Sequence, residues 1–392
     1  MRNRGQCVRT RHSGPWLAAL LLGTGSVGWA GADGVPCIIP EAVGSIDTTR
    51  AMGLAFSGTT AYVADWVGLK IIDFSDPEQP TLMSTYDLSI FSFGVSVLGS
   101  TVYVANSESG LAIFDATDPR KPELLGSYDT PDWANAVTVV GTVAYVADGF
   151  SGLQIIDVSE PSVPVLLGSY DTPGRAEGVT VVGTVAYVAD GSSGLQIVDV
   201  SDPALPVLLG SIDLPSTVED VAVEGTVAYV AQRGSGLGII DVSDPASPVL
   251  LGSIETYLAV SVSVDGSVVF VANDNRGLWD EPSLQIIDVR DPASPFLLGS
   301  YYTVRPGRDV VVADSIAYLA NDSWGLLTLD VSGDCSDCLA DLNSDGLLDF
   351  FDLQIFLNWY VALDPRADFF ANGIISYNDV YEFLYIYEAG CP

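Results

Sequence analysis

Oxygen-bearing side chains alternate along a short stretch near the carboxyl end of the chain, DLNSDGLLDFFD at residues 341–352. Side-chain oxygens fall at positions 1, 3, 5, 9 and 12 of a twelve-residue loop, and a backbone carbonyl serves position 7. Hard oxygen donors at this spacing suit Ca²⁺, and Gly346 stands where such a loop turns sharply. An acidic turn without a metal would not need both features. The predicted calcium ligands are Asp341, Asn343, Asp345, Leu347 through its carbonyl, Asp349 and Asp352.

A second loop with the same layout follows at residues 368–379. Its third position is Phe370, which has no ligand atom, so we expect weaker calcium binding here. The donors that remain are Asp368, Asn372, Ile374 through its carbonyl, Ser376 and Asp379. An apolar helix is expected between the loops, from Leu353 to Val361.

Two loops of this kind, each ending in Asp and leading toward an apolar helix, resemble a dockerin domain over residues 339–392. We place the small α-helical, EF-hand-type domain at 336–392. The resemblance implies docking to a cohesin-like receptor or to a cell-surface anchor. The terminal Gly390-Cys391 is similar to variants that anchor secreted bacterial proteins. Because dockerins bring their ends together, the resemblance also implies a disulfide from Cys338 to Cys391.

The first 32 residues are predicted to be a secretory signal peptide. Basic residues come first, an apolar run from Trp16 to Leu22 follows, and Ala30-Gly31-Ala32 supplies small residues before the first acid. The run is too short to span a membrane, and no other stretch approaches a spanning length. We therefore expect a soluble, secreted or cell-surface monomer.

The chain is strongly acidic, with a formal net charge of −35, and the leader holds four of the 15 basic residues but none of the 50 acids. Such a surface repels nucleic acid and anionic lipid. The only histidine, His12, also lies in the leader. A Ser-His-Asp or Cys-His catalytic arrangement is therefore excluded after the leader, and we assign no catalytic residue.

A repeat dominates the middle of the chain. The phrase typified by LQIVDVSDP recurs seven times, at spacings of 42, 42, 42, 42, 47 and 42 residues. Periods of this length fit helical HEAT or armadillo units as well as propeller blades. Each unit, however, carries four short runs rich in Val, Ile, Leu and Tyr, separated by turn residues, and it lacks helical periodicity. In the fourth copy the runs are 178–182, 185–189, 195–200 and 207–212.

Four strands repeated seven times predict an all-β, seven-bladed β-propeller at residues 33–335, because closure into a ring buries both faces of every sheet. Leu195-Gln196-Ile197-Val198-Asp199 and its relatives resemble the LVIVD repeat, a family of extracellular β-propellers. The resemblance implies the fold and leaves the activity open.

The ends of the repeat predict how the ring closes. Residues 40–48, PEAVGSIDT, match the outer strand PVLLGSIDL at 206–214, while the seventh copy lacks that strand. We expect the amino-terminal strand to complete the last blade and a Cys37–Cys335 disulfide to lock it. Zinc or redox chemistry at Cys335-x-x-Cys338 is the alternative, but no second such pair and no histidine after the leader would complete the site.

Loops between second and third strands, and loops between blades, are expected to share one face of the ring. Aromatic and basic residues gather there, and residues 273–283, NDNRGLWDEPS, form the longest loop. These side chains could stack on sugars, anchor a protein or clamp a carboxylate, or they could simply pack the loops. The predicted ligand-binding residues are Trp66, Trp133, Arg175, Arg233, Arg276, Trp279, Arg305, Arg308 and Trp324.

Two functions remain open. The first is a non-enzymatic binding or scaffold protein that presents a glycan- or protein-binding face and is anchored through the dockerin-like module. The second is an extracellular polysaccharide-degrading enzyme, a glycosidase or lyase, since dockerins commonly deliver such catalysts. The regularity of the seven copies favours binding, because a catalytic site usually breaks a repeat at several inward positions.

Overall fold

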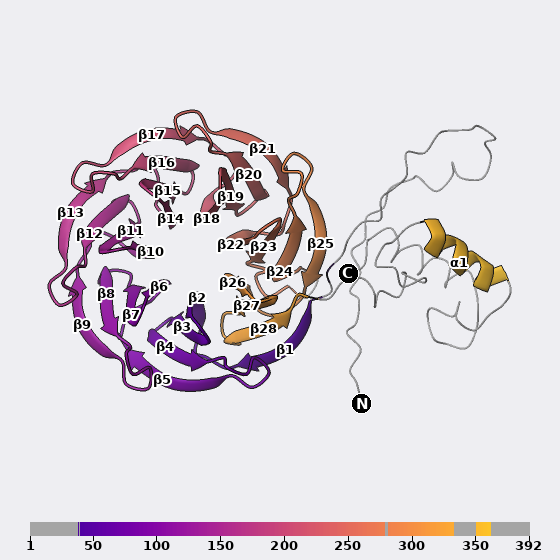
Figure 1. Ribbon diagram of the computed structural model, residues 1–392, viewed down its shortest axis with the longest axis horizontal. Coiled ribbons are helices and arrows are strands. Elements are labelled where there is room, and N and C mark those ends of the chain that lie inside the picture. The colour runs from indigo at the N-terminus through magenta and orange to yellow at the C-terminus, as the bar shows by residue number, and fades with distance from the viewer. Residues whose placement is uncertain (1–37, 39, 279–280, 333–349, 362–392) are drawn as a thin grey trace. The chain divides into compact units, whose positions relative to one another are not determined.

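The computed structural model describes residues 38, 40–278, 281–332 and 350–361. Its main unit, residues 40–331, holds seven four-stranded antiparallel sheets arranged as blades around a ring (Figure 1). The predicted signal peptide, the four cysteines after it, Trp279 and the second calcium loop lie outside the described residues. So does the first calcium loop up to Asp349, and these assignments stay predictions.

Each of the first four blades runs from an inner strand at the channel to an outer strand at the rim. Blade 1 holds β2 (Ala51–Ser57), β3 (Thr60–Asp65), β4 (Gly68–Asp73) and β5 (Thr81–Asp87). Blade 2 holds β6 (Gly94–Leu98), β7 (Thr101–Ala105), β8 (Leu111–Asp115) and β9 (Glu123–Tyr128). Blade 3 holds β10 (Ala134–Val140), β11 (Val143–Asp148), β12 (Leu153–Asp157) and β13 (Val165–Tyr170). Blade 4 holds β14 (Gly178–Val182), β15 (Val185–Ala189), β16 (Leu195–Asp199) and β17 (Val207–Ile212).

The remaining blades follow the same order, except that the last one takes its outer strand from the start of the chain. Blade 5 holds β18 (Val218–Glu224), β19 (Val227–Gln232), β20 (Gly236–Asp241) and β21 (Val249–Ile254). Blade 6 holds β22 (Ala259–Asp265), β23 (Val268–Asn273), β24 (Leu284–Asp288) and β25 (Phe296–Tyr301). Blade 7 holds β26 (Asp309–Ala313), β27 (Ile316–Ala320), β28 (Leu326–Asp330) and β1 (Glu41–Ile46).

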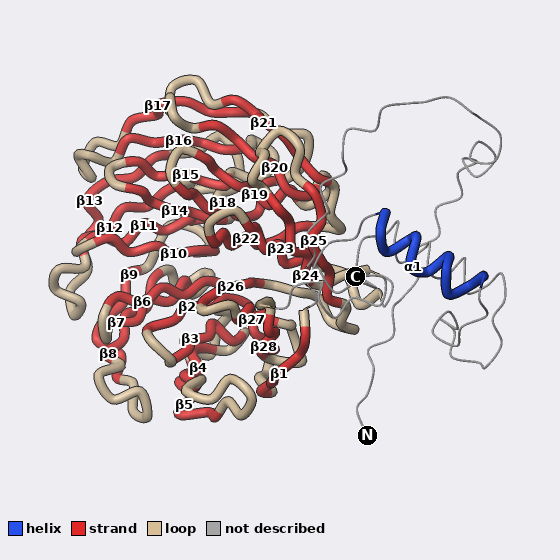
Figure 2. The backbone as a smooth tube through the Cα atoms, turned by 45° about the vertical axis from the view of Figure 1, so that its right-hand side comes forward, coloured by secondary structure: helices blue, strands red, loops and turns tan. Residues whose placement is uncertain are grey.

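The ring closes as the sequence predicts. Strand β1 pairs antiparallel with β28, from Glu41 opposite Asp330 to Ile46 opposite Leu326, and the two strands lie side by side in Figures 1 and 2. Larger side chains fill the seam between blades 7 and 1. Phe56 and Phe74 pack on Tyr318 with ring centroids 4.3 and 5.2 Å apart, where the other repeats carry Val or Ala in place of Phe74.

The core lies between blades. The second and third strands are buried on both faces, which explains their continuous apolar runs such as VAYVA and LQIVD. One cluster joins Tyr145 and Ile155 of blade 3 to Val188 and Val198 of blade 4, and similar clusters recur at neighbouring interfaces. Each blade is therefore stabilised by its neighbours.

A glycine in the outer strand permits close contact between blades on the rim. A Cβ placed on Gly168 would lie 2.5 Å from the carbonyl oxygen of Pro203, in the Asp-Pro turn of the next blade. Gly126 and Gly210 meet the corresponding turns in the same way. In blade 1 the same position is Ser84, whose hydroxyl donates to the Pro119 carbonyl at 2.6 Å. The repeated Leu-Leu-Gly-Ser phrase thus records a contact between blades.

Helix α1 (Phe350–Val361) belongs to a second compact unit and covers the range where an apolar helix was expected. It begins three residues earlier than predicted and so includes Asp352. Its Phe356 is buried, and the Phe356 ring stacks with that of Tyr360 at 6.2 Å. None of the helices in the described residues is long and apolar enough to cross a membrane.

The Gly168 contact predicts a position-specific cost. We expect Gly168→Ala to lower the free energy of unfolding by about 2 kcal/mol, since the new Cβ must push the Pro203 carbonyl away. Gly183→Asn is the matched control, because Gly183 has a φ of +62° with no atom within 4 Å of the place that a Cβ would take, and Asn tolerates that backbone. Denaturant titration measures both. Equal losses in the two variants would contradict this account of the rim contact.

Candidate functional site at the channel mouth

The inner strands of the seven blades line a central cavity of about 320 Å³. The pairing register shifts at the start of the inner strands β2, β10, β18 and β22. Each shift is a β-bulge that inserts one extra residue where the strand begins at the channel mouth. Bulges re-aim side chains, and here the residue at that position contributes to the cavity wall. The residues at this level of the channel mouth, one from each blade in order, are Met52, Phe93, Asn135, Glu177, Glu219, Val260 and Arg308.

One residue deeper, the repeat changes character. In every blade the residue at this position pairs with an alanine of the second strand, and a polar residue follows that alanine. The seven positions are therefore structurally equivalent. In blade order it holds Gly53, Gly94, Ala136, Gly178, Asp220, Ser261 and Asp309. Four small residues thus form one side of the cavity, and three consecutive polar residues form the other. This inward break was not predicted from the sequence.

The two aspartates of this layer connect neighbouring blades. Asp220 accepts hydrogen bonds from the backbone N–H groups of Val221 at 2.8 Å and Val262 at 3.0 Å. Asp309 accepts from Leu54 N at 2.7 Å and from the Ser261 hydroxyl at 2.7 Å. Burial, reinforced by the Asp309 charge, raises the pKa of Asp220 to about 6. Burial likewise raises the pKa of Asp309. Both carboxylates are therefore held by the chain itself, which indicates a structural role.

Arginines and acids alternate around blades 5, 6, 7 and 1 above the cavity. Arg308 contacts Asp322 at 3.0 Å and Asp274 at 3.2 Å, and Arg50 contacts the same oxygen of Asp322 at 3.0 Å. Arg233 extends the series to Glu219 at 2.8 Å. Burial works to raise the pKa of Asp322, but Arg308 and Arg50 together hold it below its ordinary value.

Glu177 and Glu219 lie at the channel mouth on the adjacent blades 4 and 5. Arg175 pairs with Glu177 at 2.6 Å, and this contact favours the ionised carboxylate. Burial and the neighbouring Glu219 charge act more strongly in the opposite direction and raise the pKa of Glu177 to about 7. Within the described residues, no group of three or more His, Cys, Asp or Glu is placed to hold a metal ion.

Aromatic rings occupy the other side of the mouth, over blades 1, 2 and 3. We call Trp66, Phe91, Phe93 and Trp133 the aromatic arc. Centroid distances are 4.2 Å from Trp66 to Phe91, 6.1 Å from Trp66 to Phe93 and 6.4 Å from Phe93 to Trp133. The Arg50 guanidinium lies 4.2 Å from the Trp66 ring and so joins the arc to the ion pairs. Phe91 and Trp133 are 40% and 38% exposed.

The predicted ligand-binding residues fall into three groups, which lie in the aromatic arc, in ion pairs and in loops. Trp66 and Trp133 lie in the aromatic arc, while Arg175, Arg233 and Arg308 form ion pairs with carboxylates of the chain. Trp324 is 48% exposed in the loop between β27 and β28. Arg276 lies in the long loop, where its backbone N–H donates to Asp274. The Arg305 carbonyl accepts from Thr303 and Asn321.

The residues that the sequence analysis missed are of two kinds. Phe91 and Phe93 precede an inner strand. No other blade has an aromatic residue at the position of Phe93, and at the position of Phe91 only blade 3 has one, Trp133. Glu177, Glu219, Asp274 and Asp322 are four of 50 acids, and nothing in the sequence marks them out. The comparison that could have found Asp220, Ser261 and Asp309 is an alignment of the seven inner strands, position by position.

Fold and site define a seven-bladed β-propeller with an asymmetric, polar-aromatic channel mouth. The LVIVD repeat model matches residues 49–88, 92–130, 133–172, 173–214, 216–256 and 258–303, which is more than half of the chain. The chain belongs to the LVIVD repeat family.

Solved structures share the fold at low identity. The β-propeller domain of Cps50 (Swd1) from Myceliophteria thermophila is 12% identical, with a TM-score of 0.62, and the match covers 75% of this chain and all of that one. The computationally designed Ika8 protein is 9% identical, with a TM-score of 0.55, over 74% of this chain and all of that one. No match was found among curated proteins.

The raised pKa of Glu177 predicts a pH-dependent cost. The folded protein keeps this proton up to about pH 7, whereas an unfolded chain loses it near pH 4.5, so the stability contributed by Glu177 falls as pH rises through that window. We expect Glu177→Gln to remove about 1 kcal/mol of this decline. Urea titrations from pH 4.5 to 8 measure it. Glu255→Gln controls for the lost charge, and the same slope in wild type and Glu177→Gln would refute the assignment.

Proposed function

We propose that the propeller is a non-enzymatic binding module that takes a glycan at the channel mouth. The aromatic arc carries this proposal. Sugar rings present flat C–H faces that stack on aromatic rings, and Trp66, Phe91 and Trp133 form such a surface beside the cavity. The channel mouth next to the arc supplies Asn135, Glu177 and Glu219, whose oxygens can accept hydrogen bonds from sugar hydroxyls.

The electrostatics of the mouth favour an uncharged ligand. Arg233 and Arg308 already neutralise carboxylates of the chain, and Arg175 already pairs with Glu177, which weakens the expectation that they clamp an acidic ligand. The chain as a whole carries a formal charge of −35 and repels anions. A neutral, hydroxyl-rich glycan fits these conditions better than an acidic polysaccharide, and a protein ligand is the alternative occupant of the same face.

Export and anchoring complete the proposed role. The leader at 1–32 would direct secretion, and the dockerin-like module at 336–392 would bind calcium and attach the propeller to a cohesin-like receptor or to the cell surface. Both proposals rest on the residue patterns in these segments. Helix α1, which begins at Phe350 within the last three positions of the predicted loop, is consistent with that pattern.

One observation favours an enzyme as the second candidate. The pKa of Glu177 is raised to about 7, and Glu177 lies near Glu219. Glycosidases use a pair of carboxyl groups, one of them with a raised pKa, as acid and base. A glycosidase or lyase acting on a bound polysaccharide would place these two groups at the scissile bond.

The aromatic arc gives a test of glycan binding. A glycan array should identify neutral glycans that bind the full chain, and Trp133→Ala should weaken each by about fivefold, because the loss of one stacking ring costs on the order of 1 kcal/mol. Trp324→Ala is the matched control, since it removes an exposed tryptophan of the same face outside the arc. Retention of full affinity by Trp133→Ala would exclude the arc as the binding surface.

The same glycans separate binding from catalysis. After incubation with the protein, we expect no new reducing ends and no unsaturated products. Release of either that is abolished by Glu177→Gln would establish the enzyme and reject the non-enzymatic proposal.

Calcium binding is tested independently of the propeller. Isothermal titration of the full chain with Ca²⁺ should show a site that Asp341→Ala weakens by at least about tenfold, because position 1 of the loop supplies a charged ligand. Asp368→Ala, at position 1 of the second loop, should have a smaller effect. A chain that binds no Ca²⁺, or an Asp341→Ala variant with wild-type affinity, would count against the EF-hand-type loop.

A further inference from the structure

A band of apolar side chains lies exposed on the outer rim of blades 3, 4 and 5. We call this band the apolar belt. It follows strands β13, β17 and β21 and the turns before them, and Val165, Val207 and Val249 are 53%, 57% and 55% exposed. The belt consists of Val163, Val165, Leu166, Leu205, Val207, Leu208, Val249, Leu250 and Leu251. Contiguous exposed apolar surface of this kind marks an interaction site more often than isolated residues do.

The fold does not require these residues. The outer strand begins opposite the repeated aspartate in every blade, and the residue at that position is Glu41, Thr81 and Glu123 in blades 7, 1 and 2. In blades 3, 4 and 5 it is Val165, Val207 and Val249, and in blade 6 it is the half-buried Phe296. Polar and apolar side chains therefore occupy one structural position in one ring. Exposed apolar residues occupy this position in the three consecutive blades 3, 4 and 5, which indicates a local function rather than a requirement for folding.

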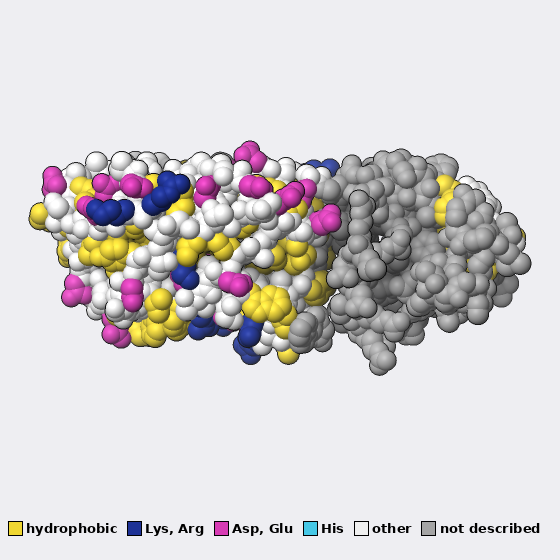
Figure 3. Space-filling model, turned by 90° about the horizontal axis from the view of Figure 1, so that it is seen from below, with side chains coloured by type: hydrophobic (Ala, Val, Ile, Leu, Met, Phe, Trp, Pro, Cys, Tyr) yellow, Lys and Arg dark blue, Asp and Glu magenta, His cyan; other side chains and the backbone are white. Residues whose placement is uncertain are grey.

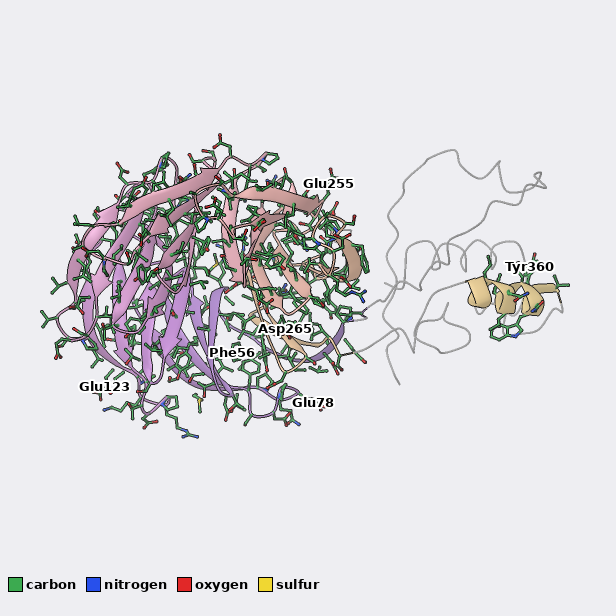
Figure 4. All side chains as sticks on the ribbon, turned by 45° about the horizontal axis from the view of Figure 1, so that its top comes forward. Phe56, Glu78, Glu123, Glu255, Asp265 and Tyr360 are labelled. Carbon is green, nitrogen blue, oxygen red and sulfur yellow. The ribbon has the colours of Figure 1, made fainter. Side chains whose placement is uncertain are left out.

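Acidic residues border the belt on both sides. Glu160, Asp202 and Asp244 lie exposed in the turns that precede it, and Asp171, Asp213 and Glu255 lie exposed after it. Glu255 stands at the outer edge of the ring in Figure 4. No Lys or Arg occurs in residues 159–171, 201–213 or 243–255.

The other half of the rim differs. Arg120 and Lys121 lie in the turn of blade 2, where Lys121 pairs with Glu123 at 2.5 Å. Figure 3, which views the ring from the side of β5, shows Lys and Arg among Asp and Glu there. In blade 6, whose outer strand also exposes Leu297, the preceding turn carries Arg290. The combination of exposed apolar residues and unmixed acids is therefore found in blades 3, 4 and 5.

We propose that the apolar belt docks a partner segment whose apolar side chains are flanked by Lys and Arg. The apolar residues would bury against Val165, Val207 and Val249, and the basic ones would face the two acidic borders. A second copy of this chain is disfavoured as the occupant, because two belts in contact would bring acidic borders against each other in a protein that is already strongly anionic. This surface lies on the rim and is independent of the glycan proposal.

A synthetic peptide tests the inference on the full chain. The probe is an amphipathic peptide of Leu and Lys, titrated by fluorescence anisotropy at low and high salt. The variant Val165→Thr, Val207→Thr and Val249→Thr removes apolar surface without adding charge, and Thr81 shows that the fold accepts threonine at this position. We expect at least about tenfold weaker binding by the triple variant, and weaker binding at high salt.

The matched control is Leu82→Thr with Leu124→Thr, which removes exposed leucines from blades 1 and 2. This double variant should bind like wild type, and a Leu and Glu peptide should bind to none of the proteins. Melting curves confirm that each variant is folded. Equal binding by wild type and the triple variant would overturn the proposal. So would sedimentation that shows a wild-type dimer which the triple variant abolishes, because the occupant would then be a second copy.

Discussion

The burial of both faces of every blade is the constraint on which the rest of the structure depends. A four-stranded sheet with apolar residues on both faces is not stable alone in water, so each blade needs a neighbour on either side. The same requirement applies at every interface around the ring, including the one between blades 7 and 1, where the ring closes. There β1 supplies the missing outer strand, and Phe56, Phe74 and Tyr318 fill the interface. A ring of this kind keeps the inner strands at fixed positions, and the channel mouth inherits that rigidity.

Most of the architecture could be predicted because the repeat states it seven times. In the fourth blade three of the four predicted strands have the observed bounds, and β16 ends one residue earlier than expected. The closure was also predictable, since a strand missing from one end of a periodic sequence appears at the other. The loop-bearing face was inferred from the order of strands. These features depend on local pattern and period, which a single sequence contains.

The chemistry of the site depends on information that the period does not hold. Arg50 and Asp322 are 272 residues apart and meet only because the ring closes. Their pairing, like that of Arg233 with Glu219, turns residues that look like free cations into parts of a neutralised network. Asp220 and Asp309 are two of many acidic residues in the sequence. They stand out only when the seven inner strands are aligned, because the equivalent position in blades 1 to 4 holds a small residue. The mouth thus combines a half in which arginines neutralise acids with an aromatic half. On the outer rim of blades 3, 4 and 5, by contrast, the segments that carry the acids contain no Lys or Arg.

The pairing of β1 with β28 also has a consequence for the order of events when the chain is made. The first strand to leave the ribosome finds its partner only after the last repeat has been synthesised, so the final blade assembles from the earliest and latest parts of the propeller. Such a long-range pairing forms slowly, because a long loop must close before any contact offsets the entropy. A chain cut short before β28 would leave β1 unpaired and the side of blade 1 bare. Closure therefore acts as a check on completeness, since only a full-length propeller can hide both of its ends.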